Sequence, residues 1–233
     1  INRISLRDMP TGQYFPCRFC SSGQIAAAGV TSTTIEVSFS GEGEILIVDD
    51  QNRRTGYDFE QGTIVNEIPN SGSTPLKNGL GLNIPPIFQI PATLENGKAS
   101  GLYQVYVSGK TIDSLTNGDL SISGAGFVMG VDAITLDKNE LYRFDISPDG
   151  TEIYFEATQD TFAPSLFLAF DLTSTELPGL VVEINDMLLK AGEVAYLRVD
   201  EQAQRLYFVS TAETVPLVDR NLNVTVSALW HDG

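Results

Sequence analysis

The chain has 233 residues, of which 14 are basic and 30 acidic, and its formal net charge at pH 7 is −16. Apolar residues make up 42% of the chain and charged residues only 19%, which favours a folded domain with a sizeable core over an acidic disordered tail. The acidic balance argues against nucleic-acid or anionic-lipid partners, and no apolar run has the length of a transmembrane helix.

The first 23 residues are expected to form an N-terminal arm. Because the chain begins at Ile1, we expect either a processed mature chain or a fragment of a longer one. Processing implies export, so we expect a protein found outside the cell or at its surface. Cys17 and Cys20 are the only cysteines, and a zinc site would need two further ligands, whereas the chain has a single histidine, His231. We predict a local disulfide. A metal, a redox role or a link between chains is the alternative.

Short segments with alternating apolar and polar residues fill residues 24–125, the first of two expected β domains. The segments are 35–39, 44–48, 102–107 and 120–122. Turn-forming residues separate strands at 40–43, 70–72, 96–97 and 117–118, and again in the second half of the chain at 148–150. Many short strands with such turns predict an all-β protein, built as an immunoglobulin-like or jelly-roll-like β-sandwich.

Residues 69–91 break this pattern. They contain Pro69, Pro75, Pro85, Pro86 and Pro91 together with three glycines. Proline removes backbone donors from a sheet and glycine weakens strands, so we expect a long irregular crossover that packs over an edge or contacts a partner.

The run Arg-Thr-Gly-Tyr-Asp at 54–58, followed by Gly62 and by Asn-Glu-Ile-Pro at 66–69, resembles a pattern in accessory β modules of large exported bacterial proteins. A Gly-x-Tyr-x-Val-x-Val-x-Gly strand follows in those modules, and residues 101–109 match it here. The resemblance covers about residues 30–130, with Phe59 in place of the usual proline. It implies a non-catalytic extracellular module without a fixed ligand.

The second expected domain, residues 126–233, contains an internal repeat. Residues 127–174 and 180–229 align with an offset of 53, and each copy is expected to run strand, hairpin turn, strand, loop, strand. Residues 144–158 also resemble a strand-turn-strand unit of TolB-type propellers. A propeller needs at least about four blades, and no copies precede residue 125, so we favour packed β domains.

Asp145, Asp149 and Glu156 have the spacing of an EF-hand calcium loop. Strands are expected on both sides, and Pro148 with Gly150 is typical of a hairpin turn. We therefore predict a turn, with calcium as the alternative and no other cofactor.

Catalytic motifs are missing from the sequence, which has one histidine and no Gly-x-Ser-x-Gly, Walker or His-Glu-x-x-His motif. We therefore predict that the chain is not an enzyme. Tyrosines recur on the expected strands, where most should be core residues or cross-strand pairs, and some could form a platform for sugars. They are Tyr103, Tyr106, Tyr142, Tyr154, Tyr196 and Tyr207.

Two functions remain open at this point. The first is a structural or adhesive protein that assembles with copies of itself, on the cell surface or in a filament, by β-strand addition. The adding strand would come from the arm, with Ile4 and Leu6, or from the tail, with Leu222, Val224 and Val226. The arm could equally fold on its own body. The second function is a module of a larger secreted enzyme that binds surface glycan or another partner, with Tyr103 as the test residue.

Overall fold

The computed structural model describes residues 2–5, 34–75, 85–92, 101–158, 165–171, 179–185, 189–200, 205–210 and 223–229. Within these ranges the chain is all-β and contains no helix, so no described helix could cross a membrane. The strands are β1 (Asn2–Ser5), β2 (Thr34–Phe39), β3 (Glu44–Val48), β4 (Arg54–Asp58), β5 (Thr63–Asn66), β6 (Gly72–Thr74), β7 (Ile87–Pro91), β8 (Tyr103–Ser108), β9 (Thr116–Gly124), β10 (Phe127–Leu136), β11 (Leu141–Ile146), β12 (Glu152–Glu156), β13 (Ser165–Asp171), β14 (Gly179–Asn185), β15 (Val194–Asp200), β16 (Arg205–Ser210) and β17 (Asn223–Leu229).

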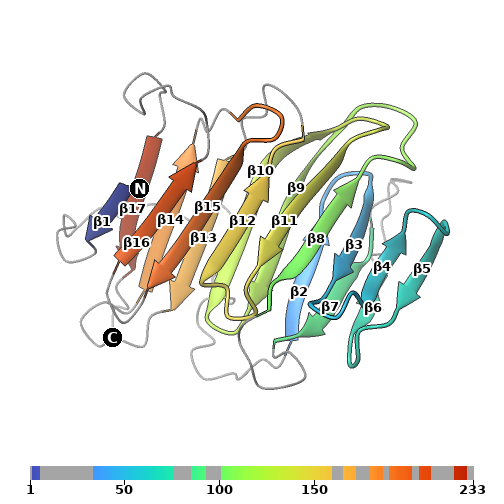
Figure 1. The fold of residues 1–233 in the computed structure, drawn as a ribbon, viewed down its shortest axis with the longest axis horizontal. Helices are drawn as coiled ribbons and strands as arrows, with labels where there is room; N and C mark the ends of the chain where they lie inside the picture. The colour runs from blue at the N-terminus through green and yellow to red at the C-terminus, as the bar shows by residue number, and fades with distance from the viewer. Residues whose placement is uncertain are drawn as a thin grey trace.

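Two antiparallel sheets face each other in a β-sandwich, as the sequence predicts (Figure 1). The first sheet has the order β1-β16-β15-β12-β11-β8-β3-β4-β5, and the second has the order β17-β14-β13-β10-β9-β2-β7-β6. Strands β1 and β17 lie at the left-hand end of Figure 1, and β5 and β6 lie at the right-hand end. Each end of the sandwich therefore presents one edge strand from each sheet.

The chain builds the sandwich by adding hairpins to the two sheets in turn. From β9 onward, the hairpins β9-β10 and β13-β14 join the second sheet, while β11-β12 and β15-β16 join the first. The expected repeats, 127–174 and 180–229, thus place their strands in the same order of sheets. The repeat of the sequence itself stays a prediction.

Both sheets continue across the expected domain boundary at residues 125 and 126. That boundary falls in the turn between β9 and β10, which pair from Phe127↔Gly124 to Leu136↔Thr116. One cluster of buried residues runs from Ile35 to Val199 and includes members from either side of the boundary. The described parts of 24–125 and of 126–233 therefore share one core.

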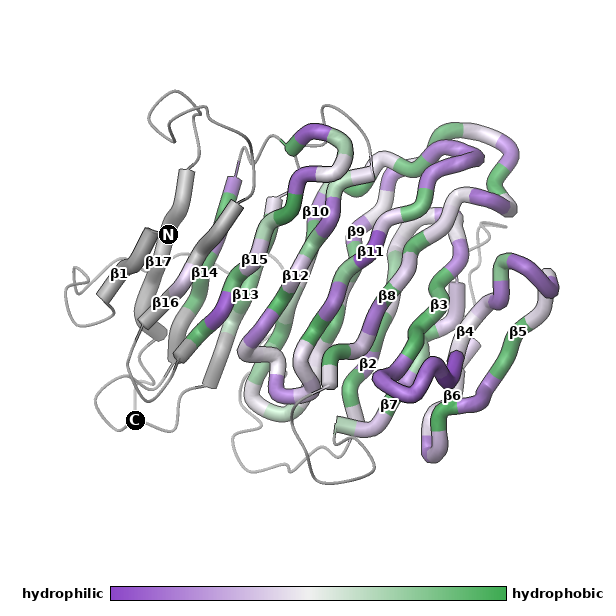
Figure 2. Tube along the Cα trace, in the orientation of Figure 1, coloured by the Kyte–Doolittle hydropathy of each residue, from purple (hydrophilic) through white to green (hydrophobic). Residues whose placement is uncertain are grey.

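Alternation along the strands decides which side chains enter that core (Figure 2). In β12, Ile153 and Phe155 are buried while Tyr154 is half-buried on the outer face. The Phe155 ring stacks on Phe144 of β11 with centroids 4.8 Å apart. Such pairs contribute dispersion energy beyond the area that they bury. A second, small cluster of Phe167, Ala169 and Val181 is also buried, on the outer face of the second sheet.

The segment 69–91 differs from the expected irregular crossover. The chain does pass here from the first sheet to the second, but the segment includes strands β6 and β7, which pair with each other, and β7 also pairs with β2. Its prolines flank the strands, except for Pro91 at the last position of β7. Residues 87–90 can therefore pair as a strand, and their alternation places Phe88 and Ile90 in the core, where both are buried.

The expected turn at Asn117 and Gly118 is wrong, because both residues lie inside β9. Gly118 is needed there for close packing. A Cβ at this position would lie 2.5 Å from the Phe39 ring and 2.5 Å from the Gly41 nitrogen. Glycine at 118 thus marks a close approach of two chain segments, and not a reversal of the chain.

Candidate functional site

The Arg-Thr-Gly-Tyr-Asp motif forms β4, and its arginine joins the two ends of a hairpin. On the outer face, the Arg54 guanidinium forms ion pairs with Asp58 and, at 2.8 Å, with Glu67 just beyond β5. The Arg54 side-chain hydrogen bond holds the pKa of Glu67 below its ordinary value. The Asp58 carboxylate accepts hydrogen bonds from the backbone nitrogens of Gln61 and Glu60, and these bonds lower its pKa.

Contacts on the inner face and a close backbone approach explain two more positions of the motif. The Thr55 hydroxyl lies 2.7 Å from the Ser71 hydroxyl, and the Asn66 side chain donates to the Ser71 carbonyl at 3.2 Å. Gly56 has a φ of 124°, and a Cβ there would lie 2.3 Å from the Ile45 carbonyl oxygen. The structure thus gives the motif residues an architectural role, because they close the β4-β5 hairpin and fix the chain that leads to β6.

Loss of the Thr55 hydroxyl should measurably weaken this hairpin. Thr55 is 1% exposed, so Thr55→Val leaves the Ser71 and Asn66 side chains with a buried apolar neighbour. We expect the free energy of unfolding to fall by about 1–3 kcal/mol in urea denaturation. The same change at Thr63, which is exposed in β5, is the control. Equal effects of the two substitutions would contradict this account.

The proposed calcium loop is a hairpin turn between β11 and β12. The Gly150 nitrogen donates to the Ser147 carbonyl at 3.0 Å, and Gly150 has a φ of 71°. The Asp149 carboxylate accepts from the Ser147 hydroxyl at 2.6 Å and from the Thr151 nitrogen at 3.0 Å. Burial raises the pKa of Asp149, but these hydrogen bonds outweigh it and the net shift is downward. The carboxylate therefore stabilises the turn.

The other two calcium candidates lie on the adjoining strands. Asp145 forms a two-point ion pair with Arg143, with contacts of 2.8 Å to Nε and 2.6 Å to Nη2. Glu156 lies opposite Arg143 on β12. In the described part of the chain, no group of three or more His, Cys, Asp or Glu residues is placed to hold a metal ion. Asp145, Asp149 and Glu156 are thus not brought together as ligands.

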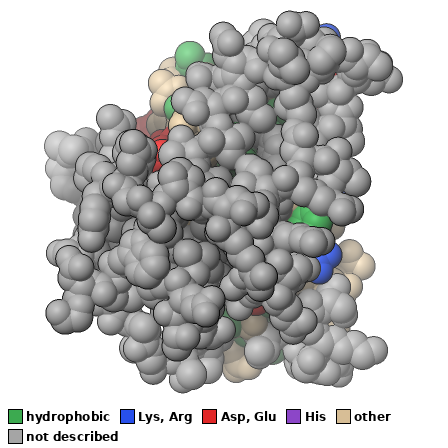
Figure 3. All heavy atoms as spheres, turned by 90° about the vertical axis from the view of Figure 1, so that its left-hand side faces the viewer, with side chains coloured by type: hydrophobic (Ala, Val, Ile, Leu, Met, Phe, Trp, Pro, Cys, Tyr) green, Lys and Arg blue, Asp and Glu red, His purple; other side chains and the backbone are tan. Residues whose placement is uncertain are grey.

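The expected assembly strands pair within the chain. Ile4 of β1 lies opposite Leu206 of β16, while Val224 and Val226 of β17 lie opposite Ile184 and Val182 of β14. Strands β1 and β17 are the edge strands of the two sheets at one end of the sandwich. Figure 3 shows the molecule from that end. Leu6, Leu222, Cys17 and Cys20 lie outside the described residues, so the disulfide stays a prediction.

The opposite end of the sandwich exposes its edge strands. In β5, Thr63, Ile64 and Asn66 are exposed, and the three residues of β6 are exposed or half-buried. Ile64 lies opposite Tyr57 of β4, and both lie on the sheet face that carries the core residue Ile47 of β3. Its side chain is nevertheless 60% exposed. Within the described residues, this end of the sandwich therefore exposes an apolar side chain of the inner sheet face, and we call the β5/β6 end the open end.

The tyrosines fall into two groups, and the sequence did not separate them. Tyr103 and Tyr142 belong to the core, where the Tyr103 hydroxyl donates to the Pro91 carbonyl at 2.8 Å and the Tyr142 hydroxyl to the Thr135 carbonyl at 2.9 Å. Burial raises the pKa of both phenols. Tyr103 is 0% exposed and so cannot contact a sugar, which makes it the wrong test residue for that function.

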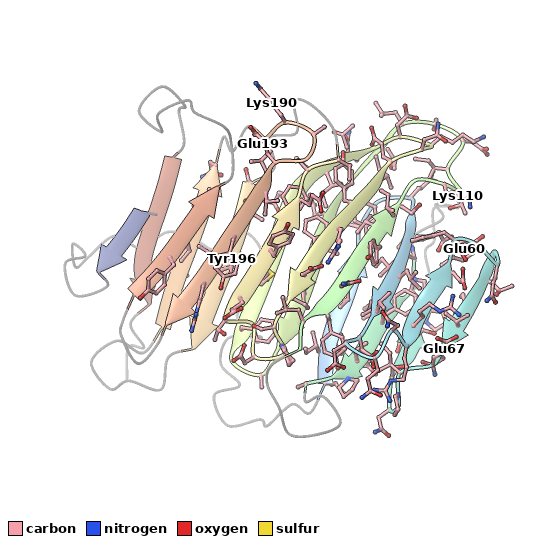
Figure 4. The ribbon with its side chains drawn as sticks, viewed as in Figure 1. Glu60, Glu67, Lys110, Lys190, Glu193 and Tyr196 are labelled. Carbon is pink, nitrogen blue, oxygen red and sulfur yellow. The ribbon has the colours of Figure 1, made fainter. Side chains whose placement is uncertain are left out.

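The second group defines what we call the tyrosine face, the outer face of the first sheet from β8 to β16. Four half-buried tyrosines lie on this face, Tyr106, Tyr154, Tyr196 and Tyr207. They share it with the polar residues Gln104, Arg143, Asp145, Glu152, Glu156 and Arg198. Tyr154 and Tyr196 lie directly opposite each other on β12 and β15. Figure 4 shows Tyr196 on β15, far from Glu67 at the other end.

Several polar groups of the tyrosine face pair with one another. The Tyr106 hydroxyl donates to Gln104 Oε1 at 2.9 Å, and Arg198 lies 3.3 Å from Glu152. Burial raises the pKa of Tyr196, and the negative charge of Glu152 raises it further. Burial and the charge of Glu156 raise the pKa of Tyr154 in the same way. Both phenols therefore stay uncharged at neutral pH and can donate and accept hydrogen bonds.

Comparison with protein-family models, with curated proteins and with solved structures gives no match to this chain.

Proposed function

We propose that the protein is a non-catalytic structural or adhesive component of the cell surface or of an extracellular filament, and that copies assemble end to end by β-strand addition. The observation that carries this proposal is the open end of the sandwich, where Ile64 faces inward yet is 60% exposed. An exposed edge strand presents unpaired backbone donors and acceptors to another chain.

A second copy is the partner that fits this end. One end of the sandwich terminates in β5 and β6, and the other terminates in β1 and β17. If the β1/β17 end of one copy meets the β5/β6 end of the next, both sheets continue through the contact. Such a head-to-tail contact uses two different surfaces, so it produces a ring if the rotation closes and an open filament if it does not.

The charge of the chain adds a condition to this proposal. Copies with a net charge of −16 repel each other, and salt screens that repulsion. Assembly should therefore increase with ionic strength, and light scattering across a salt series measures it.

The test of assembly is a charge placed at the open end. Ile64→Lys removes an apolar contact and places an ammonium group in the interface, so we expect association to weaken at least tenfold. The measurement is the mass in solution over a concentration series, with negative-stain images. Leu115→Lys is the matched control, because Leu115 is 62% exposed but lies between β8 and β9, away from both edges. A wild-type chain that stays monomeric at all concentrations and salts would refute the proposal.

A further inference from the structure

The two outer faces of the sandwich differ in chemistry. On β2, β9 and β10 of the second sheet, the outward positions include Ser38, Ser121, Ser123 and Gly130. The tyrosine face instead carries four half-buried phenol rings on β8, β12, β15 and β16. Aromatic side chains supply large, rigid contact area at a low entropic cost. Further along the second sheet, the outer face carries the small buried cluster of Phe167, Ala169 and Val181. The half-buried phenol rings are therefore a feature of the tyrosine face.

The tyrosine face also supplies directional polar groups between the rings. Arg143 is held by its two-point ion pair with Asp145 on the same strand, in register with Tyr106 on one side and Glu156 on the other. Arg198 and Glu152 repeat this pairing beside Tyr196. Because these two Arg–carboxylate pairs hold their own groups in place, a ligand meets donors and acceptors that are already oriented, and less entropy is lost on binding.

The charges of the tyrosine face and of the whole chain indicate which class of ligand could bind there. Among the side chains that the structure describes on the tyrosine face, two arginines accompany three carboxylates, so their charges nearly cancel, while the chain as a whole carries −16. An anionic polymer would be repelled by this field. A neutral sugar ring presents an apolar face of C–H groups and a rim of hydroxyls. The apolar face can stack on a phenol ring, and the hydroxyls can exchange hydrogen bonds with paired Arg and Asp or Glu side chains.

We propose that the tyrosine face binds a neutral polysaccharide chain, with Tyr154 and Tyr196 as the central stacking residues. From Tyr106 on β8 to Tyr207 on β16 the face crosses four strand spacings, or about 19 Å, which accommodates several sugar rings in a row. The flat face of a sheet suits an extended chain. This inference is independent of end-to-end assembly, because it uses a different surface of the sandwich.

The experiment measures depletion of the full chain from solution by insoluble cellulose, curdlan, chitin and mannan, with polygalacturonate as the anionic polymer. We expect at least one neutral polysaccharide to bind the wild-type chain. The double variant Tyr154→Ala/Tyr196→Ala should bind that polysaccharide at least tenfold more weakly. Tyr154→Phe/Tyr196→Phe keeps both rings and should stay within about threefold of the wild type. Each alanine replacement falls on an outer-face position, and circular dichroism with urea denaturation checks that both double variants are folded.

Two control variants separate this site from the open end. Tyr57→Ala removes a half-buried tyrosine of β4 that lies outside the tyrosine face, and Ile64→Lys disrupts the proposed assembly contact. Both should bind the polysaccharide as the wild type does. The proposal is overturned if no neutral polysaccharide binds, if the double alanine variant binds normally, if only polygalacturonate binds, or if Ile64→Lys alone abolishes binding.

Discussion

Replacement of Phe155 by alanine is expected to lower the free energy of unfolding by about 3–5 kcal/mol. Phe155 is 0% exposed and stacks on Phe144 with ring centroids 4.8 Å apart, so the truncation leaves a cavity between β11, β12 and the opposite sheet. The cost has two parts, the lost transfer of the ring from water and the cavity that the surrounding strands cannot fill. Chemical denaturation by urea, followed by tryptophan fluorescence or circular dichroism, measures it.

The neighbouring Tyr154 is the control for this prediction. It precedes Phe155 in the same strand, and the period of two places its ring on the opposite face of the sheet. Tyr154→Ala removes a ring of similar size from a half-buried position, so we expect a loss of only about 1 kcal/mol or less. The two variants together test the strand register of β12. Equal losses, or a larger loss for Tyr154, would show that this register is wrong.

The fold class could be predicted from the sequence because it depends on local signals. Alternation at 35–39, 44–48 and 102–107 appears as β2, β3 and β8, with inward residues such as Ile35 and Val105 fully buried. The hairpin turn at Ser147–Gly150 also follows from local chemistry, since proline fixes one dihedral angle and glycine adopts a positive φ. Such features need no knowledge of the other strands.

Pairing between distant strands could not be predicted in this way. Nothing local shows that the first strand, β1, lies beside β16, or that Gly118 packs against Gly41. The tyrosines show the same limit. Tyr103 and Tyr106 belong to one strand but differ in sequence position by an odd number, so only one of them can face the core. Counting parity from the buried Val105 would have separated them.

The exposure of Ile64 at the open end could not be predicted from the sequence either. An isoleucine in an alternating segment is normally assigned to the core, and only the sheet order shows that β5 is the last strand. The position of the arginines on the tyrosine face could not be predicted for a different reason. Arg143 lies at even spacing from Asp145 on β11, a signal that marks a shared face of the sheet but does not show which residues lie across from it.

Alkaline pH is expected to destabilise the protein through its two buried tyrosines. Burial raises the pKa of Tyr103 and Tyr142, so both phenols stay protonated in the folded chain above the pH of about 10 at which exposed tyrosines ionise. The folded state then holds more protons than the unfolded state. The stability from these groups is complete below pH 10 and falls as the pH rises toward their folded-state pKa values, by about 1.4 kcal/mol per pH unit for each tyrosine.

The double variant Tyr103→Phe/Tyr142→Phe isolates this effect from the general repulsion in a chain of high negative charge. At neutral pH we expect it to be less stable than the wild type by about 1–3 kcal/mol, because the carbonyls of Pro91 and Thr135 lose their phenol donors. Between pH 10 and 11.5 its stability should fall less steeply than that of the wild type, and the difference in slope should approach about 2.8 kcal/mol per pH unit for the pair at the upper end of this range. Urea denaturation midpoints across this range measure both slopes. If the slopes are equal, the two phenols ionise as easily in the folded chain as in the unfolded one, and their burial between the two sheets cannot be as described.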